Sequence, residues 1–251
     1  MARTYITYNQ WRLLVEKLKT IQFKFHSKNL KKFFEALVYK FRTGIPWRDI
    51  PRKFGHYKSI HSKFRYWVNN KIFVQIFKAS QKEPDLEWLQ LDGTLVKAHQ
   101  HSTGYPDIDK RKMGKTVGGN NSKIHAVVDS FGMPLNFIIT SGEKHDSTEA
   151  INLIDKIENY NYVIADKAYH SYEIREFIKH NGAIPVIPKK SNSINFNEEE
   201  FDKVIYKERH KVENFFCKIK HFRGIATRYD KNFENYEAGL HLISTLFWLK
   251  F

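Results

Sequence analysis

Two short apolar runs that each end in an aspartate constrain the fold of this chain more than any other feature. Trp88-Leu89-Gln90-Leu91 leads into Asp92, and Tyr162-Val163-Ile164-Ala165 leads into Asp166. Short continuous apolar runs are typical of strands that are buried on both faces, in sheets covered by helices. We therefore expect a mixed α/β sheet in which the two aspartates end neighbouring strands.

A third acid lies on a predicted helix at about 205–221, within the pattern Tyr206-x(2)-Arg209-x(3)-Glu213-x(6)-Lys220. At about 100° per residue, these four side chains fall within an arc of roughly 60°. The opposite side of the helix is apolar and is expected to pack on the sheet; it carries Val212, Phe215, Ile219 and Phe222. The polar side would then present one carboxylate between two cations.

Each of the three acids also has a purely structural interpretation. Glu213 between cations is typical of a surface ion-pair ladder. Asp92 precedes Gly93 and can belong to a turn, whereas Asp166 can cap the helix that follows it. Taken together, however, two strand-terminal acids and a helical one form an oxygen-ligand set that suits Mg²⁺ or Mn²⁺. A pair of such ions about 3.5–4 Å apart can activate a nucleophile at a phosphodiester. Arg209 and Lys220 are then expected to hold adjacent phosphates.

The basic charge of the chain is concentrated at its N-terminal end. Of the net charge of +15, residues 1–86 carry +14, from 19 Lys/Arg against 5 Asp/Glu, and the other residues carry 23 against 22. This asymmetry predicts a DNA-holding domain at 1–85 and a chemical domain at 86–251, joined by a linker at 81–85. A basic module that binds a membrane surface is the alternative.

The N-terminal domain is expected to be all-helical and helix-turn-helix-like. Helices are predicted over 8–20, 30–42, 57–69 and 72–80. On the third helix, Tyr57, Ile60, Phe64, Trp67 and Val68 share the apolar face. The opposite face is expected to contact DNA through Lys58, Ser59, Ser62, Lys63 and Tyr66. The alternative for this face is the solvated side of a small helical bundle.

Beyond the linker, strands and helices alternate. We expect a strand that ends at Asp92 and runs on to Val96, a polar loop over 99–122, and a hairpin of 124–128 with 134–140. Further helices are predicted over 147–157, 171–180 and 236–249, and a further strand over 183–187.

Several classes of protein are disfavoured. The single cysteine, Cys217, excludes an intramolecular disulfide framework and a cysteine-rich zinc site. The most apolar segment, 240–251, is too short to span a bilayer, and no signal sequence opens the chain. The twelve histidines lack zinc spacing, and a P-loop and a GxGxxG motif are missing. We expect a cytoplasmic protein.

These acids and the Y-(2)-R-(3)-E-(6)-K pattern resemble the DDE transposases of bacterial insertion sequences. The resemblance covers nearly the whole chain; it extends to the segments 42–51, 132–135, 144–147, 166–169 and 223–231. It implies a ribonuclease H-like catalytic domain and a metal-dependent polynucleotidyl transferase and endonuclease. The implied catalytic and metal-binding residues are Asp92, Asp166 and Glu213, with two Mg²⁺ or Mn²⁺ ions.

The resemblance also implies partners. We expect double-stranded DNA, both as terminal inverted repeats and as target, and a homodimer on that DNA, with no membrane. The expected activity is cleavage at the element's ends and transfer of the 3′-OH strands to target DNA. Two alternatives remain: an inactive or repurposed DNA-binding protein of the same fold, and a nuclease without strand transfer.

Overall fold

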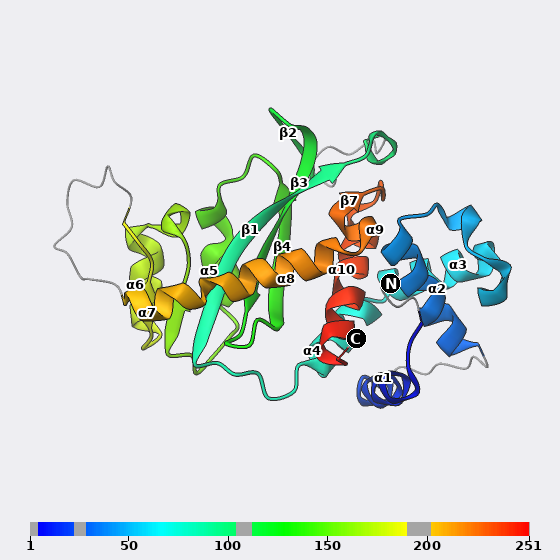
Figure 1. Ribbon diagram of the computed structural model, residues 1–251, viewed down its shortest axis with the longest axis horizontal. Coiled ribbons are helices and arrows are strands. Elements are labelled where there is room, and N and C mark those ends of the chain that lie inside the picture. The colour runs from blue at the N-terminus through cyan, green and yellow to red at the C-terminus, as the bar shows by residue number, and fades with distance from the viewer. Residues whose placement is uncertain (1–4, 23–28, 104–111, 190–201, 251) are drawn as a thin grey trace. The chain divides into compact units, whose positions relative to one another are not determined.

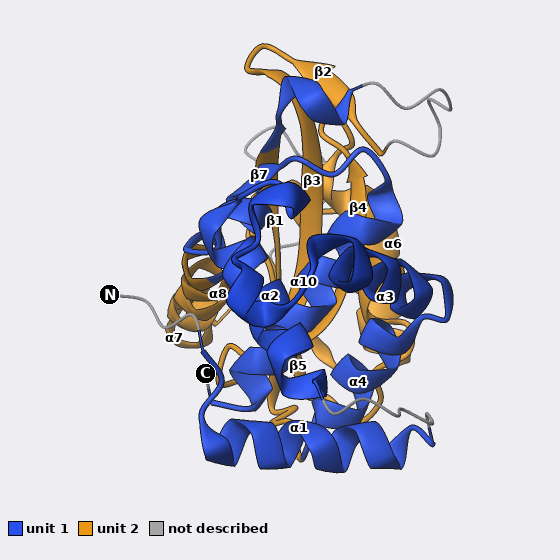
Figure 2. Ribbon diagram, turned by 90° about the vertical axis from the view of Figure 1, so that its right-hand side faces the viewer, with its two compact units in different colours: residues 1–82, 97–111, 219–251 blue, residues 83–96, 112–218 orange. Residues whose placement is uncertain are grey.

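The computed structural model describes residues 5–22, 29–103, 112–189 and 202–250 (Figure 1). They form two compact units, of which unit 1 comprises 1–82, 97–111 and 219–251, and unit 2 comprises 83–96 and 112–218 (Figure 2). These units differ from the predicted domains at 97–111 and 219–251. The functional division at residues 85 and 86 stays a prediction.

Unit 1 begins with four helices at the predicted positions: α1 (Tyr8–Thr20), α2 (Leu30–Thr43), α3 (Tyr57–Asn69) and α4 (Ile72–Ser80). The start of α1 is fixed by a capping box between Thr7 and Gln10. α2 ends at Gly44, whose φ of 74° is a left-handed conformation that glycine adopts without strain. Short 3-10 turns over Trp47–Asp49 and Arg52–Phe54 lead into α3.

Aromatic side chains form the core of this helical part. The rings of Phe33, Phe34, Trp67 and Phe73 contact one another, with centroid separations of 5.2 to 5.7 Å. Pairs of this geometry contribute about 0.5–1.5 kcal/mol each beyond the area that they bury. Phe33, Phe34, Trp67 and Phe73 are buried. On the predicted apolar face of α3, Ile60, Phe64, Trp67 and Val68 are buried as expected, whereas Tyr57 is half-buried.

The C-terminal part of unit 1 contains α9 (Arg223–Ala226), β7 (Thr227–Arg228) and α10 (Phe233–Trp248). α10 packs against α4, and β7 pairs in parallel with the end of β1 at Lys97 and Ala98. The predicted start of the last helix, at 236, was wrong. Asn232 caps the helix by accepting a hydrogen bond of 2.7 Å from the backbone of Glu234, so α10 starts three residues earlier.

Unit 2 is built on a mixed sheet, as predicted. Its strands are β1 (Trp88–Ala98), β2 (Gly114–Thr116), β3 (Gly119–Val128), β4 (Pro134–Ser141), β5 (Tyr162–Ile164) and β6 (Ile184–Val186). Their order is β2-β3-β1-β5-β6, with β4 paired to β3. β5 lies parallel to both β1 and β6, whereas β3 and β4 form the predicted antiparallel hairpin.

The polar loop predicted over 99–122 was wrong in its described part. A 3-10 turn (Gln100–Ser102), β2 and the start of β3 lie there, while 104–111 fall outside the described residues. β2 and the start of β3 are polar and pair with each other as a ribbon. Apolar alternation was therefore missing as a signal for strands.

The turn between β3 and β4 depends on Asp129 and Gly132. The Asp129 carboxylate accepts hydrogen bonds from the backbone N–H groups of Phe131 and Met133, at 3.0 and 2.8 Å. Gly132 has a φ of 77°, and a Cβ on it would lie 3.2 Å from the carbonyl oxygen of Lys211. Glycine thus satisfies both the turn and a close approach to the helix that carries Lys211.

The helices of unit 2 are α5 (Ala150–Ile154), α6 (Tyr172–His180), α7 (Lys203–Tyr206) and α8 (His210–Lys220). The helix predicted over 147–157 is shorter and begins with a 3-10 turn, η5 (Asp146–Glu149). The helix predicted over 205–221 is interrupted by a second 3-10 turn, η7 (Lys207–Arg209). A uniform 100° per residue therefore does not hold between Tyr206 and Glu213.

Alternate residues of β1 face two different layers of helices. Leu89 and Leu91 belong to an apolar cluster that includes Leu153 of α5 and Ile178 of α6. Gln90 faces the other way, and its side-chain oxygen accepts a hydrogen bond of 3.2 Å from the backbone of Val212 in α8. No helix among the described residues is long and apolar enough to cross a lipid bilayer.

Candidate active site

The parallel pairing of β1 with β5 places Asp92 and Asp166 at the same edge of the sheet. The ladder ends with Gln90 opposite Ile164, and each aspartate lies two residues further along its strand. The prediction of neighbouring strands is confirmed. Because side chains alternate along a strand, Asp92 lies on the face of Gln90, which is the face of α8.

A backbone N–H group holds one oxygen of each aspartate. Oδ1 of Asp92 accepts from Gly93 at 2.8 Å, and Oδ1 of Asp166 accepts from Ala168 at 2.8 Å. Asp166 thereby caps the 3-10 turn η6 (Lys167–Tyr169). The cap interpretation of Asp166 is therefore correct as local geometry. The turn interpretation of Asp92 is wrong, because Asp92 and Gly93 lie within β1. Such contacts orient a carboxylate without using its second oxygen.

α8 brings Glu213 to the same region. The helix is anchored by its bond to Gln90 and by Lys211, whose ammonium lies 5.4 Å from the centre of the Trp88 ring. Val212 and Phe215 of the helix are buried, whereas Glu213 is half exposed. The apolar side thus packs on the sheet, as the pattern predicted.

Arg209 connects two of the three acids. Its Nη1 lies 3.3 Å from Oδ2 of Asp92, and its Nη2 donates a hydrogen bond to Oε1 of Glu213. The guanidinium therefore joins the acid of β1 to the acid of α8. A forked, permanently charged group suits this bridging position better than an ammonium group would.

The electrostatics of Asp92 are unusual for an aspartate. Burial, together with the charges of Asp166 and Glu213, raises its pKa to about 6, although the Gly93 N–H group and Arg209 act in the opposite direction. Like charges that share a site disfavour ionisation of each other. Burial is the largest cause of the raised pKa of Asp92, and the charges of Asp166 and Glu213 add to it.

Tyr169 is a residue of this region that sequence reasoning left without a role. It is fully buried, and its hydroxyl group has no hydrogen-bond partner in the part of the chain that the structure describes. Burial raises its pKa well above the usual range, and the charges of Asp146, Asp92 and Asp166 add to the shift. The motif 166–169 contained it, but a buried tyrosine has no periodic signature that separates it from core.

The carboxylate oxygens of this region are suitable ligands for a divalent cation, but their present positions do not form a metal site. Carboxylate oxygens are the ligands that Mg²⁺ and Mn²⁺ prefer. Within the described residues, however, no three His, Cys, Asp or Glu side chains are spaced to hold one metal ion. Arg209 bridges two of the candidate ligands instead. The expected convergence of all three acids on one point is therefore not seen in this arrangement.

The other residues of the helical pattern lie apart from this bridge. Tyr206 ends α7 and is half-buried, and Lys220 ends α8 and is exposed. Because η7 breaks the helix, the expected single polar stripe from Tyr206 to Lys220 is interrupted. Their predicted contacts with DNA stay a prediction.

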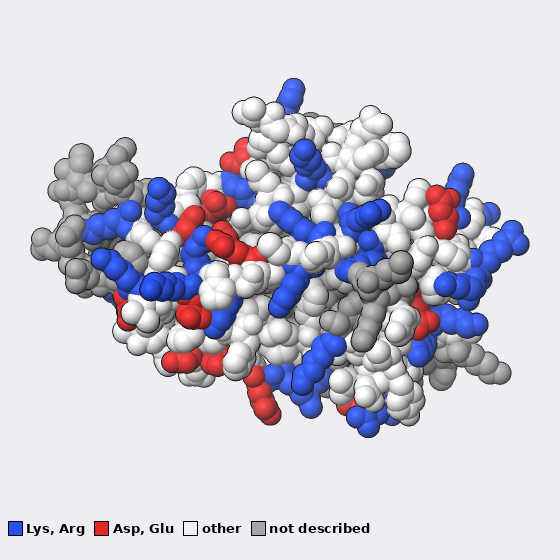
Figure 3. All heavy atoms as spheres, in the orientation of Figure 1, with Lys and Arg blue, Asp and Glu red and all other residues white. Residues whose placement is uncertain are grey.

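The polar face of α3 lies largely in solvent, as expected. Lys58, Ser59, Ser62 and Tyr66 are exposed, whereas the Lys63 ammonium lies 4.8 Å from the centre of the Phe33 ring. Where Figure 3 shows the N-terminal helices of unit 1, basic side chains predominate. The role of this face in DNA binding stays a prediction.

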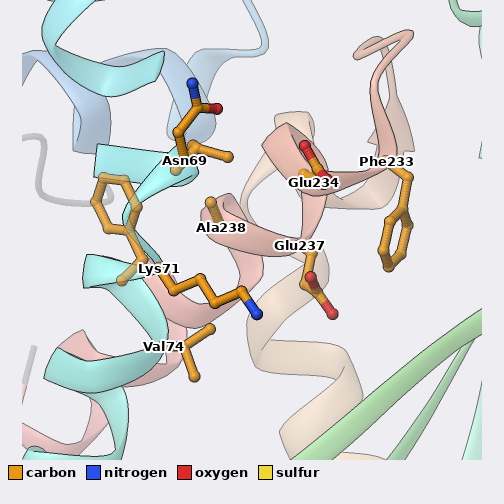
Figure 4. A pocket seen from close by; sticks show the side chains of 9 residues that line it. Asn69, Lys71, Val74, Phe233, Glu234, Glu237 and Ala238 are labelled. Atoms are coloured by element: carbon orange, nitrogen blue, oxygen red, sulfur yellow. The ribbon is translucent and has the colours of Figure 1, made fainter. Parts of the chain in front are cut away.

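A cavity of about 540 Å³ lies elsewhere in unit 1, lined by α3, α4 and α10 (Figure 4). Apolar side chains and three charged ones, Lys71, Glu234 and Glu237, line it. None of the three candidate acids does. The cavity is therefore not part of the candidate active site.

Comparison with known sequences settles the family. Residues 85–248 match the sequence family "Transposase DDE domain", and residues 6–77 match "Putative transposase of IS4/5 family". The chain belongs to the DDE transposase family. It is therefore an enzyme of the transposase type, and the resemblance inferred from the motifs is confirmed.

Relatives of this transposase come from insertion sequences. A protein of Brucella ovis, described as "Putative transposase for insertion sequence element IS6501", is 36% identical over 133 residues, which are 51% of this chain and 98% of that protein. A Burkholderia cepacia protein, described as "Putative transposase for insertion sequence element IS402", is 29% identical over 154 residues, or 54% of this chain and 70% of that protein.

A solved transposase structure shares the fold. The chain is similar to the piggyBac transposase of a synaptic complex with hairpin DNA, with a TM-score of 0.56 and 11% identity over 98% of this chain and 71% of that one. The expected fold class is confirmed: this transposase has a ribonuclease H-like mixed sheet flanked by helices, preceded by a helical N-terminal region.

Proposed function

We propose that this transposase binds the terminal inverted repeats of an insertion sequence, cleaves the DNA ends and transfers the 3′-OH strands to target DNA. The observation that supports the proposal is the arrangement of three acids on separate elements of the chain. Asp92 and Asp166 end adjacent parallel strands, and Arg209 joins Glu213 to Asp92. The raised pKa of Asp92 supports their interaction.

Asp92, Asp166 and Glu213 would hold two Mg²⁺ or Mn²⁺ ions. Bound divalent cations would supply activation of water and neutralisation of charge on the phosphate. Binding requires that Arg209 give up at least one of its two carboxylates, because it now bridges Asp92 and Glu213. Once released, its planar fork is suited to a phosphate oxygen.

Two successive substitutions at phosphorus make up the reaction. In the first, water adds at the element's end, the bond to the 3′-oxygen breaks, and that oxygen takes a proton to become a 3′-OH. In the second, this hydroxyl attacks a target phosphodiester, whose own 3′-oxygen leaves. Each step forms one P–O bond and breaks another, so no ATP is required.

DNA binding and assembly belong to the same proposal. The exposed polar face of α3, which begins with Lys58, would hold the inverted repeat. Both ends of an element have to be joined to one target, so we propose a homodimer on DNA.

The test is a reaction of the full chain with labelled element-end DNA, Mg²⁺ and a target plasmid. The proposal predicts both nicked ends and joined products. Nicks without joined products would reduce the function to that of a nuclease. Binding without either product would leave a DNA-binding protein of the same fold.

A further inference from the structure

On the face of β1 opposite to α8, two polar side chains close in on Gly93. A Cβ built on Gly93 would lie 2.5 Å from Oδ1 of Asp146 and 3.6 Å from Nδ1 of His125. A Cβ atom does not come within 2.5 Å of an atom of another side chain. The carboxylate of Asp146 therefore occupies volume that is available only because residue 93 is glycine.

Lys123 holds the Asp146 carboxylate in this position. Its ammonium lies 3.0 Å from Oδ1 of Asp146 and donates a hydrogen bond of 2.6 Å to the carbonyl oxygen of Lys144. The side chains of Asp146 and Lys123 are 27% and 13% exposed, so solvent screens this ion pair only in part. The pair also disfavours Asp146 as a direct metal ligand, because a metal ion would have to displace the ammonium.

His125 packs near the Asp146 carboxylate and limits its movement. It is fully buried, and its Nε2 lies 2.8 Å from Oγ1 of Thr140, which gives its own proton to the carbonyl oxygen of Ser141 at 3.1 Å. Nδ1 has no hydrogen-bond partner among the described residues and lies 3.9 Å from Oδ1 of Asp146.

A buried ring nitrogen without a hydrogen-bond partner in a native structure calls for a physical reason. The reason offered by the geometry is the position of Gly93. Lys123 holds the Asp146 carboxylate in place, and His125 blocks its movement away from Gly93. Oδ1 of Asp146 therefore packs against the backbone of β1 at Gly93.

That backbone also orients Asp92. The N–H group of Gly93 donates a hydrogen bond of 2.8 Å to Oδ1 of Asp92. The peptide at Gly93 thus has the candidate ligand on one face and Asp146 on the other. The charges of both Asp92 and Asp146 add to the raised pKa of the buried Tyr169 hydroxyl, as expected if the two acids lie near the same side chain.

We propose that Asp146 is a positioning residue for Asp92. Paired with Lys123 and backed by His125, it fixes β1 at Gly93 and thereby the direction in which the Asp92 carboxylate faces its ligand. This inference rests on the proposed function, because Asp92 acts there as a metal ligand. Residues that orient metal ligands typically change metal affinity or activity about 10–100-fold when they are replaced.

Variants of the full chain separate positioning from charge. Asp146→Ala removes the support. Asp146→Asn keeps the shape of the side chain and an oxygen that faces Lys123 but removes the charge, so it should recover most of the activity. Gly93→Ala keeps every charge but pushes the carboxylate away. The double variant Gly93→Ala/Asp146→Ala fills the vacated volume with the new methyl group, so its loss should be smaller than the product of the two single losses.

Two readouts are needed: the rate of end cleavage as a function of Mg²⁺ concentration, and Mn²⁺ binding measured by electron paramagnetic resonance without DNA. We expect Asp146→Ala and Gly93→Ala to weaken Mn²⁺ binding and to raise the half-saturating Mg²⁺ concentration, each about 10-fold or more. Asp129→Asn is the matched control, since this buried acid serves the β3–β4 turn. It should lower the melting temperature and leave the Mg²⁺ dependence unchanged.

The inference is overturned if Asp146→Ala and Gly93→Ala bind Mn²⁺ as the wild type does, or if their losses only follow the melting temperature as in Asp129→Asn. A multiplicative loss in the double variant would also contradict it. Should Asp146→Ala fail to fold, Asp146→Asn and Gly93→Ala carry the same comparison. Asp92→Ala separates the two claims: wild-type cleavage by this variant sinks the proposed function, whereas its inactivity beside a fully active Asp146→Ala sinks only the inference.

Discussion

Nη1 of Arg209 lies 3.3 Å from Oδ2 of Asp92 and links the start of the α8 segment to the end of the buried part of β1. The same guanidinium bonds to Glu213. One permanent cation thus offsets two of the acids that are proposed to hold metal ions. In the proposed function, metal binding would release Arg209 from the carboxylates, and the guanidinium would then contact a DNA phosphate.

Arg209→Ala is expected to destabilise the protein in the absence of divalent ions. Asp92 and Glu213 would face each other and Asp166 without compensation, at a cost on the order of 1 kcal/mol. Mg²⁺ should then raise the melting temperature more in this variant than in the wild type. Thermal melts with and without Mg²⁺ measure this, and Lys207→Ala, an exposed cation of the preceding turn, is the control. If Mg²⁺ raised the melting temperature equally in all three proteins, Arg209 would not compete with metal ions for the carboxylates.

Arg209→Lys tests the geometry of the same group. An ammonium group cannot donate to two carboxylates, or to a phosphate, through a planar fork. We expect cleavage to slow although the melting temperature matches that of the wild type. Cleavage at the wild-type rate would leave Arg209 as a structural partner of the acids only.

Asp92→Asn should stabilise the metal-free protein at pH 8. Burial and two like charges penalise the ionised Asp92 carboxylate, and its pKa of about 6 corresponds to a penalty on the order of 3 kcal/mol. A neutral amide of similar shape removes part of that penalty. Urea unfolding in the presence of a chelator measures the gain. A lower free energy of unfolding than in the wild type would show that the bridge to Arg209 outweighs the repulsion.

Much of the fold could be predicted because local signals agree with it. Apolar runs mark β1 and β5, and helical spacing together with Gly44 marks α2 and its end. The β2–β3 ribbon was missed because its residues are polar. The interruption of the predicted helix at Lys207–Arg209 was missed because this segment contains no proline or glycine.

The candidate site was predicted in its residues but not in its contacts. The strand-terminal positions of Asp92 and Asp166 follow from pattern alone, and the parallel pairing confirms that they are neighbours. That Arg209 reaches Asp92 depends on how α8 crosses the sheet, which is a tertiary property. The approach of Asp146 to Gly93 likewise joins distant segments, and its only trace in the sequence is the glycine.

Lys58 and Lys63 on α3 should respond differently to replacement. Lys58 is exposed, so Lys58→Ala should weaken binding to inverted-repeat DNA and reduce the slope of log affinity against log salt by about 0.9 if it contacts one phosphate. The Lys63 ammonium lies over the Phe33 and Trp67 rings, so Lys63→Ala should lower the melting temperature. Fluorescence anisotropy over a salt series, with melts of both variants, tests the pair. An unchanged slope in Lys58→Ala would remove this face from the DNA interface.

Below pH 6.5 the protein should lose stability through His241 of α10. Burial lowers the pKa of this histidine from 6.5 to about 4, so the folded protein binds fewer protons than the unfolded chain between these values. The free energy of unfolding should therefore fall as the pH drops from 6.5 towards 4, by roughly 3 kcal/mol from this group. His241→Gln should flatten that part of the profile in urea titrations at several pH values. Parallel profiles of the two proteins would contradict the assignment.

The central claim is that Asp92, Asp166 and Glu213 act as one site in cutting DNA. The most direct measurement is Mg²⁺-dependent cleavage of element-end DNA by the full chain and by Asp92→Ala, Asp166→Ala and Glu213→Ala, with affinity for the same DNA measured in parallel. Glu208→Ala is the matched control, because Glu208 is an acid of the same helical segment that pairs with Lys211 at 2.7 Å. The account predicts that each of the three variants binds the DNA as the wild type does and yields no cleavage, while Glu208→Ala cleaves normally. Wild-type cleavage by any one of the three would contradict it.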